Sequence, residues 1–220
     1  MIYTLTMNPA ADYILTVDGL TIGKVNRALS AQEEKSAGKG VNVSRFLTGL
    51  GVENTAIVAG INRTNVKIHH DGCVTEINAA GQANEQIVNE VAGKLTEIKK
   101  GDWLIMSGSL PGGVNECFYE EICKSMCAKG VKAIVDTSGE PLRRVAETEW
   151  AWLIKPNRQE LSELGENTKI WCNALVSMDV QGAMLTIGSK VYTITKAYQI
   201  DELMIEAYGQ SPVKINNVTI

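Results

Sequence analysis

The sequence predicts an α/β fold: a central, mostly parallel β-sheet with helices on both faces, joined to a small β-sheet lid. Short β-rich segments recur between helix-like stretches along the 220 residues, which is typical of parallel strands connected by helices. The helix-like stretches carry apolar residues at helical spacing, as expected of helices that bury one face. We therefore expect residues 1–220 to form one domain, since a chain of this length needs no second large core.

Six β-rich segments are the predicted strands of the central sheet. They are Ile2–Thr6, Ala56–Ala59, Trp103–Met106, Ala133–Val135, Trp152–Ile154 and Leu175–Val176. Three of the helices between them have one apolar stripe each, and we expect each stripe to be buried against the sheet. The stripes are Val43, Phe46, Leu47 and Leu50; Ile87, Val88, Val91, Leu95 and Ile98; and Phe118, Ile122 and Met126.

Two regions with few helix signals, about 12–36 and 62–78, interrupt this alternation. Their β-rich pieces are Tyr13–Val17, Lys24–Leu29, Ala31–Lys35, Thr64–His70 and Cys73–Asn78. Together they predict a small sheet of about four strands, an appendage of the kind that covers a ligand site as a lid. Ordinary edge strands of the main sheet are the alternative.

Composition excludes several classes of protein. With 21 basic and 25 acidic side chains the formal charge is −4, so the chain lacks the basic field that dominates nucleic-acid binding. No apolar run approaches the roughly 20 residues of a membrane span, and the N-terminus lacks the basic start of a secretory signal. We expect a cytoplasmic protein. Its five cysteines form no Cys-x-x-Cys pair, which suits reduced thiols, and Cys123 and Cys127 are expected to be a helical core pair.

Polar, glycine-rich segments follow several of the predicted strands. They are Met7–Asp12, Ser107–Gly113, Asp136–Gly139 and Lys155–Glu160. Ligands of open parallel sheets bind outside the carboxyl ends of the strands, so we expect these segments to meet at one edge and to form the site.

The segment Gly38-Lys39-Gly40 lies where a polar strand turns into an apolar-periodic helix. Glycines let the backbone approach a ligand closely, and the free N–H groups of a helix start favour anions. A glycine turn with a solvated lysine is the alternative. No Ser or Thr follows the lysine as in a P-loop, and no Gly-x-Gly-x-x-Gly opens a helix, which excludes two common nucleotide motifs.

Other candidate residues each have two interpretations. Asn157 and Glu160, three apart at a helix start, would either supply oxygen ligands to a hydrated Mg²⁺ or cap the helix. Asp12 would accept hydrogen bonds from sugar hydroxyls or form a turn. Cations of the lid would select a phosphorylated substrate or be scattered surface charges. These cations are Lys24, Arg27 and Arg63.

Seven motifs occur in the same order in a known family. They are Asn8-Pro9-Ala10-Ala11-Asp12, Ala37-Gly38-Lys39-Gly40-Val41-Asn42-Val43-Ser44, Arg63-Thr64-Asn65-Val66-Lys67, Ser107-Gly108-Ser109-Leu110-Pro111, Val135-Asp136-Thr137-Ser138-Gly139, Lys155-Pro156-Asn157-Arg158-Gln159-Glu160 and Leu175-Val176-Ser177. On these motifs the chain resembles the phosphofructokinase B family of sugar kinases, which has the ribokinase-like fold. The 1-phosphofructokinases look most similar, followed by the tagatose-6-phosphate kinases.

The resemblance implies a Mg²⁺-dependent kinase that moves the γ-phosphate of ATP to a ketose phosphate, with fructose 1-phosphate giving fructose 1,6-bisphosphate as the first expectation. Tagatose 6-phosphate is the second. A nucleoside or ribose kinase of the same fold is weakened by the cationic lid. A homodimer formed through an exposed lid face is also expected.

The family's functional residues transfer to matching positions of this chain. The resemblance implies substrate binding by Asp12, Lys24, Arg27, Gly38, Lys39, Asn42, Arg63 and Ser107. It implies nucleotide binding by Lys155, Asn157, Ser177 and Gly182, and a Mg²⁺ site organised by Asn157 and Glu160.

The chain departs from the family in ways that affect activity. The family's Gly-Ala-Gly-Asp segment, which carries the general base, is absent, and no residue replaces it. The chain looks short after Gly60, between Gly165 and Asn173, and after about Thr195. Natural deletions and segments missing from the sequence both explain this, and we favour missing segments because deletion would uncover apolar core faces. A true 220-residue protein would be an inactive relative that binds a sugar phosphate.

Overall fold

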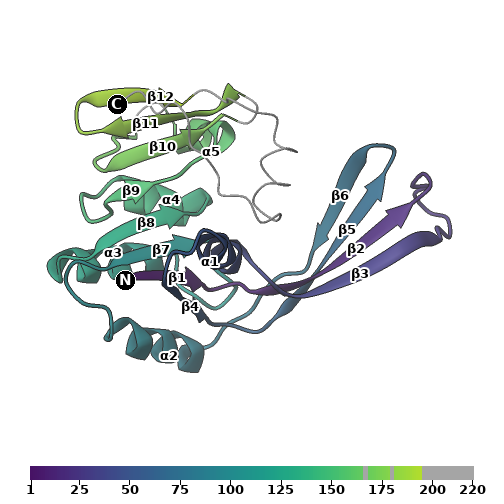
Figure 1. The fold of residues 1–220 in the computed structure, drawn as a ribbon, viewed down its shortest axis with the longest axis horizontal. Coiled ribbons are helices and arrows are strands. Elements are labelled where there is room, and N and C mark those ends of the chain that lie inside the picture. The colour runs from purple at the N-terminus through teal and green to yellow at the C-terminus, as the bar shows by residue number, and fades with distance from the viewer. Residues whose placement is uncertain (166–167, 179–180, 195–220) are drawn as a thin grey trace.

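A computed structural model describes residues 1–165, 168–178 and 181–194 of the chain and confirms the predicted fold class. The described residues form an eight-stranded sheet in the order β12-β11-β10-β9-β8-β7-β1-β4 and a separate four-stranded sheet in the order β3-β2-β5-β6 (Figure 1). We call the smaller sheet the lid sheet. It projects away from the main sheet, so it is not a set of edge strands.

All six predicted strands of the main sheet are present and pair in parallel. They are β1 (Ile2–Thr6), β4 (Asn54–Val58), β7 (Trp103–Ser107), β8 (Lys132–Asp136), β9 (Leu153–Ile154) and β10 (Asn173–Ser177). The sequence analysis did not predict the hairpin of β11 (Ala183–Ile187) and β12 (Lys190–Ile194), which adds two antiparallel strands beside β10.

Within residues 1–165, 168–178 and 181–194, five helices accompany the sheet: α1 (Lys39–Gly49), α2 (Glu85–Leu95), α3 (Phe118–Ala128), α4 (Gly139–Ala146) and α5 (Arg158–Leu164). From β1 the chain passes through α1 to β4 at one edge of the sheet, whereas from β7 it passes through α3 and α4 towards β8 and β9 in the opposite direction. Because both crossovers are right-handed, α1 lies on the face opposite to α3 and α4. None of the described helices is long and apolar enough to cross a membrane.

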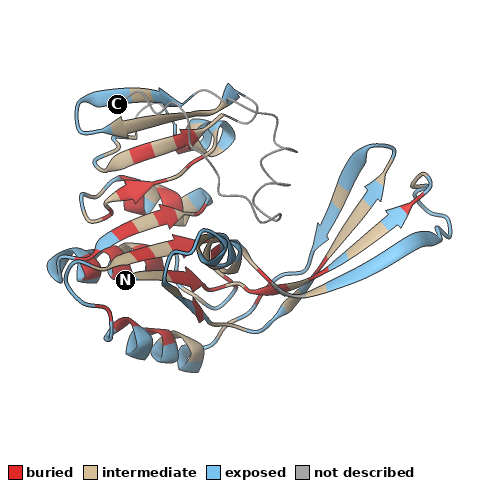
Figure 2. Ribbon diagram, in the orientation of Figure 1, coloured by how far each residue is buried: buried red, intermediate tan, exposed pale blue. Residues whose placement is uncertain are grey.

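The core lies between the central strands and the helices α2, α3 and α4 (Figure 2). As predicted, Val91 and Leu95 of α2 and Phe118, Ile122 and Met126 of α3 are buried there. Cys123 is also buried, and burial raises the pKa of its thiol. Cys127 is exposed, so the prediction of a core cysteine pair was wrong for this residue. All five cysteines are free.

The predicted burial of the α1 stripe was wrong for two of its residues. Phe46 is 55% exposed and Leu50 is 45% exposed. The physical reason is that β4 is the last strand of the sheet, and its residues Ala56 and Val58 are exposed as well. After β4 the chain passes through Gly60 directly into the lid sheet, so among the described residues nothing packs beyond this edge.

The lid sheet consists of β2 (Ala10–Val17), β3 (Ala28–Ala37), β5 (Arg63–His70) and β6 (Cys73–Asn78). A strand predicted over Lys24–Leu29 was wrong for its first four residues, which belong to the turn between β2 and β3. Asn26 holds this turn, because its side chain accepts from the N–H of Thr21 at 2.9 Å and donates to the Thr21 carbonyl at 2.9 Å. Such local side-chain to backbone bonds favour turns over strands.

The two faces of the lid sheet differ in chemistry. Strand pairing places Asp12 beside Asn65 in one row, and Tyr13 beside Val66 and Ile77 in the next. Adjacent rows project to opposite faces, so we call these the Asp12 face and the Tyr13 face. The Tyr13 face also carries Leu15, Ala31, Ile68 and Cys73. It is the more apolar face and is partly open, with Ile77 60% exposed.

Candidate functional site

The predicted loops meet at the carboxyl edge of the main sheet. Ser107 ends β7 directly beside Asp136, which ends β8. The N–H of Gly108 donates to the Asp136 carbonyl at 2.8 Å, and the N–H of Lys155 donates to the Val135 carbonyl at 2.9 Å. The loops after β7, β8 and β9 are therefore fixed to one another by backbone hydrogen bonds.

A tyrosine below the edge supports the β7 loop. Tyr119 of α3 is fully buried, and its hydroxyl donates to the Gly108 carbonyl at 3.1 Å. Burial raises the pKa of this hydroxyl, so it remains a donor at any physiological pH. The helix packing of α3 thus holds the loop that carries Ser107.

A carboxylate lies between two lysines at this edge. Asp136 Oδ1 is 3.3 Å from Lys155 Nζ and 4.0 Å from Lys39 Nζ. The sequence analysis quoted Asp136 within a motif but gave it no role, although its position at the end of a central strand was the available signal. The arrangement brings the predicted substrate residue Lys39 and the predicted nucleotide residue Lys155 to one carboxylate.

The entrance of α1 depends on its two glycines. Gly38 is the N-cap with φ 134°, a conformation that side chains rarely permit. Gly40 is buried, and a Cβ at this position would lie 2.7 Å from the Leu5 carbonyl oxygen of β1. Gly40 was predicted to let the backbone approach a ligand, but in the structure it lets α1 approach β1.

The base of the lid joins this entrance. Ala10 of β2 pairs with Ala37, the residue before Gly38, on one side and with Arg63 on the other. Arg63 Nη1 donates to the Ala79 carbonyl at 2.9 Å, whereas its buried Nε has no partner among the described residues. The register therefore holds Arg63 close to the start of α1.

Asp12 lies two residues further along β2, and its side chain is buried. It accepts a hydrogen bond from Asn65 at 2.9 Å and forms an ion pair with Lys67 at 2.7 Å. The sequence analysis gave no role to either partner. The signal was their spacing, because residues 63, 65 and 67 share one face of a strand.

Two of the remaining predicted substrate residues, Lys24 and Arg27, lie apart from this cluster. Lys24 and Arg27 are exposed in the turn at the outer end of the lid sheet, and neither forms an ion pair in the described part of the chain (Figure 1). Asn42 is exposed on the second turn of α1. The structure therefore does not bring Lys24 and Arg27 together with Lys39.

Several buried polar atoms at the carboxyl edge lack a hydrogen-bond partner among the described residues. They include Thr6 Oγ1, Asn8 Oδ1, Ser107 Oγ and Thr137 Oγ1. Buried polar groups are normally paired, and exceptions of this kind gather where a ligand completes the pairing. Their location at one edge favours this edge as the binding site.

Asn157 and Glu160 form a capping box at the start of α5. The Asn157 side chain accepts from the Glu160 N–H at 2.8 Å, and Glu160 Oε2 accepts from the Asn157 N–H at 2.8 Å. Each side chain uses one oxygen in these bonds and keeps further acceptor capacity. Ser177, the end of β10, bridges to Asn157, and Gly182 closes the next turn by accepting from the Met178 N–H at 2.8 Å.

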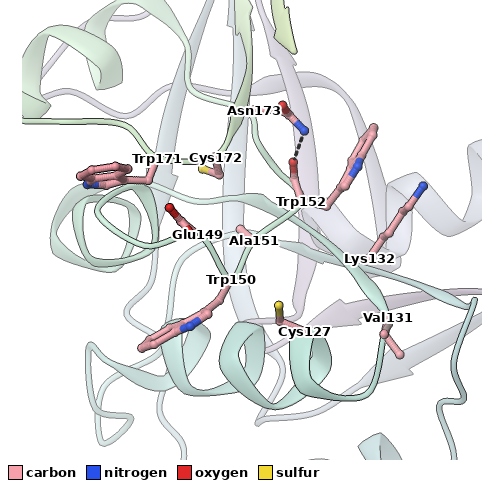
Figure 3. A pocket seen from close by; sticks show the side chains of 11 residues that line it. Cys127, Val131, Lys132, Glu149, Trp150, Ala151, Trp152, Trp171, Cys172 and Asn173 are labelled. Carbon is pink, nitrogen blue, oxygen red and sulfur yellow. Dashed lines mark hydrogen bonds between the residues drawn. The ribbon is translucent and has the colours of Figure 1, made fainter. Parts of the chain in front are cut away.

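A surface hollow of about 390 Å³ lies elsewhere and takes no part in this site (Figure 3). Its residues Lys132, Trp152 and Asn173 belong to the amino ends of β8, β9 and β10, and Asn173 donates to the Trp152 carbonyl at 2.7 Å. These ends form the edge opposite to Asp136. The indole rings of Trp150, Trp152 and Trp171 point in different directions around it (Figure 3).

A family model for the pfkB family of carbohydrate kinases matches residues 49–199. The chain belongs to the pfkB family. The 1-phosphofructokinase of Borreliella burgdorferi is 34% identical over 86% of this pfkB chain and 72% of the relative. The tagatose-6-phosphate kinase of Staphylococcus epidermidis is 33% identical over 74% of the chain and 62% of the relative. The chain thus spans between three fifths and three quarters of these two relatives.

A solved structure confirms the ribokinase-like arrangement of this pfkB chain. Phosphofructokinase-2 from Escherichia coli in complex with fructose-6-phosphate superposes with a TM-score of 0.80 and 25% identity, covering 90% of this chain and 80% of that one. The family and the fold predicted from the seven motifs are therefore confirmed. The roles of the individual site residues stay predictions.

Replacing Gly40 by alanine tests the packing at the α1 entrance. We expect Gly40→Ala to lower the free energy of unfolding by about 1–3 kcal/mol, because the added methyl group forces α1 away from β1. Gly49→Ala in the same helix is the matched control, since a Cβ there meets nothing within 4 Å and alanine gains up to about 1 kcal/mol in helix propensity. Urea denaturation measures both, and a Gly40→Ala protein as stable as wild type would contradict the packing argument.

Proposed function

We propose that this protein phosphorylates a ketose phosphate with ATP, and that fructose 1-phosphate is converted to fructose 1,6-bisphosphate. The observation that carries the proposal is the carboxylate Asp136 between Lys39 and Lys155, at the edge where the lid sheet brings Asp12 and Arg63. A site with cations on both the sheet and the lid suits a substrate that already carries a phosphate. The 1-phosphofructokinase relative supports fructose 1-phosphate, and the tagatose-6-phosphate kinase relative supports tagatose 6-phosphate as the alternative.

In this proposal the sugar side is formed by the lid and the α1 entrance. Asp12 and Asn42 hold sugar hydroxyls beside Gly38, and the phosphate of the sugar meets Arg63 and Lys39. Ser107, whose buried Oγ has no partner among the described residues, completes this side. Lys24 and Arg27 lie in the exposed lid turn, so they would reach the phosphate only when the lid sheet closes.

ATP belongs to the other half of the same edge. Lys155 and Asn157 follow β9, and Ser177 and Gly182 follow β10, so these four residues would surround the nucleotide phosphates. Phosphoryl transfer depends chiefly on positioning and on stabilising charge. Lys39, located between the two halves, is suited to neutralise the transferred group.

Mg²⁺ would bind with Glu160 and Asn157 as its protein neighbours. Among the described residues no three acidic, histidine or cysteine side chains gather to enclose a metal. This fits Mg²⁺, which keeps several waters and uses one or two carboxylates together with substrate phosphates. Glu160 Oε1 and the second lone pair of Asn157 Oδ1 would contact the hydrated ion while the capping box keeps the helix start intact.

We further propose that the complete protein contains internal segments beyond these 220 residues. The alignment with the Borreliella relative is 224 positions long, although it includes only 86% of the 220 residues of this chain. The relative therefore has internal residues that have no counterpart in this chain. The exposed Phe46, Leu50 and Val58 mark the sheet edge that a helix and strand after Gly60 would cover. The general base would come from a segment that is missing after about Thr195, and residues 195–220 of this chain lie outside the described residues. A cytoplasmic location is consistent with the five free thiols.

Enzyme assays on the complete gene product test the function. We expect an intact mass above 23.9 kDa and ATP-dependent turnover with the highest kcat/KM for fructose 1-phosphate, when compared with fructose 6-phosphate and tagatose 6-phosphate. No turnover with any of the three would refute the proposed kinase. A mass equal to that of this chain, with calorimetric binding of a sugar phosphate but no turnover, would favour the second candidate, an inactive binding protein without the general base.

The Mg²⁺ proposal is tested by Glu160→Gln. Glutamine also closes a capping box, so we expect stability to change by less than about 0.5 kcal/mol, whereas loss of the charge raises the Mg²⁺ concentration for half-maximal activity about tenfold or more. Glu163→Gln is the matched control, because Glu163 lies on the same helix and accepts only from Gln159 at 2.8 Å. An unchanged Mg²⁺ requirement in Glu160→Gln would leave the pair with a capping role alone.

We also propose that two copies of the chain associate through the Tyr13 face of the lid sheet. This face carries Tyr13 and Ile77 in one row and Leu15 two residues further along β2. Apolar side chains exposed together mark interaction surfaces. A solved structure is described as the tetrameric inhibited form of phosphofructokinase-2 from Escherichia coli, which supports oligomerisation in the family.

Sedimentation velocity tests the dimer. We expect wild type to sediment as a dimer and Ile77→Lys as a monomer, because a lysine would be buried without a partner at the interface. Val74→Lys is the control, since Val74 pairs with His69 in β5 and projects on the Asp12 face of the same strand β6. Dissociation by both variants, or a monomeric wild type, would contradict an interface on the Tyr13 face.

A further inference from the structure

The Asp12 face contains a buried cluster of three polar side chains near the base of the lid. Asp12 of β2 pairs with Asn65 of β5, and Lys67 lies two residues further along β5. Directly paired residues and residues two apart project on the same face. Asp12 is 5% exposed and Asn65 is 8% exposed. Asp12 and Asn65 are therefore largely removed from water, whereas the Lys67 side chain is 32% exposed.

Both carboxylate oxygens of Asp12 have a partner within the cluster. Asn65 Nδ2 donates to Asp12 Oδ1 at 2.9 Å, and Lys67 Nζ lies 2.7 Å from Asp12 Oδ2. The hydrogen bond with Asp12 raises the pKa of Lys67, so the lysine remains charged. A buried carboxylate needs such a counter-charge, and each oxygen still has a second acceptor direction for a ligand.

The amide of Asn65 is oriented by this contact. A carboxylate only accepts hydrogen bonds, so the amide nitrogen must be the atom that faces Asp12. The other branch, Asn65 Oδ1, is buried and accepts no hydrogen bond from any residue that the structure describes. An acceptor in this situation is costly to the fold unless a donor reaches it. A ligand hydroxyl beside Asp12 is such a donor.

We infer that Asn65 binds a sugar hydroxyl adjacent to the one held by Asp12, and that Lys67 is a positioning residue for Asp12. The ligand class is a polyol with neighbouring hydroxyl groups: one donates to Asp12, and the next donates to Asn65 Oδ1. This inference rests on the proposed function, because the ketose phosphate supplies those hydroxyls. The inference also gives the two cations of β5 different roles. Lys67 neutralises Asp12, whereas the buried Nε of Arg63 is available to the phosphate of the substrate.

Calorimetry with the complete gene product and ketose phosphates tests the Asn65 contact. We expect Asn65→Ala to weaken binding about tenfold, which equals about 1.4 kcal/mol, and Asn89→Ala, an exposed position of α2, to leave it unchanged. When the ketose phosphate is replaced by an analogue that lacks the contacted hydroxyl, we expect the affinity of wild type to fall about tenfold and the affinity of Asn65→Ala to fall no more than twofold. A merely structural asparagine would weaken every analogue equally, and that result would overturn the inference.

The wild-type protein alone provides a second test, which does not depend on the folding of a variant. In a series of single-deoxy ketose phosphates, two neighbouring hydroxyls should each contribute about tenfold in affinity. A series in which only one hydroxyl contributes would contradict a second hydroxyl ligand next to Asp12.

The positioning role of Lys67 is tested by Lys67→Met and Lys67→Arg. We expect Lys67→Met to raise KM for the ketose phosphate about tenfold and Lys67→Arg to keep KM close to the wild-type value. The affinity for inorganic phosphate should change less than twofold in both variants. If Lys67→Met weakens inorganic phosphate as much as the ketose phosphate, Lys67 is a phosphate ligand and the assignment is wrong. KM for ATP serves as the internal control.

These results separate the inference from the proposed function. If wild type turns over the ketose phosphate and Asn65→Ala binds it with wild-type affinity, only the inference is refuted. Binding without turnover would refute the kinase, while the affinities of the variants still decide the inference. Absence of any sugar-phosphate binding by wild type would refute both.

Discussion

Helix α1 lies against β1 at a distance that only glycine permits. A Cβ on Gly40 would enter the Leu5 carbonyl, and one on Gly38 would lie 2.8 Å from Thr6 Cγ2. Because α1 begins at this contact, Lys39 is fixed beside the carboxyl edge of the main sheet and directly after the lid strand β3. The contact thus determines where the lid joins the sheet and places Lys39 at the junction. A general α/β fold would tolerate a looser helix, but a site shared between two sheets would not.

Charge is organised around two carboxylates, one in each sheet. Asp136 lies between Lys39 and Lys155, and Asp12 is held by Lys67. In both places a lysine offsets an acidic side chain that the fold withdraws from water. At the lid base, Arg63 has a buried Nε that finds no partner within the described part of the chain. A guanidinium binds phosphate bidentately, whereas an ammonium acts as a point charge. The arrangement therefore suits recognition of a phosphate by Arg63 and screening of accumulated charge by the lysines.

Sequence patterns predicted the six parallel strands of the main sheet and most of the lid, because alternation and turn residues are local properties of the chain, but they missed β11 and β12. They failed where the outcome depends on neighbours distant in sequence. The α1 stripe has helical periodicity, yet Phe46 is exposed since the sheet ends at β4. Asn157 and Glu160 fit a cap and a metal site equally well by spacing, and the capping box is visible only in the hydrogen bonds. The role of Asn65 needed the pairing of β2 with β5, which no local pattern contains.

The register of β2 and β5 connects the chemistry of the lid with its assembly. Strand side chains alternate between faces, so the pairing that places Asp12 beside Asn65 also places Tyr13 beside Val66 on the other face. A slip of one residue would move the apolar row to the Asp12 face, where we propose the substrate binds, and would move the carboxylate to the Tyr13 face. The buried contact of Asn65 with Asp12 and the ion pair with Lys67 oppose that slip, because breaking them leaves an uncompensated buried charge. The polar cluster that we propose as the receptor of the sugar hydroxyls therefore also specifies which face of the lid is open for the proposed dimer.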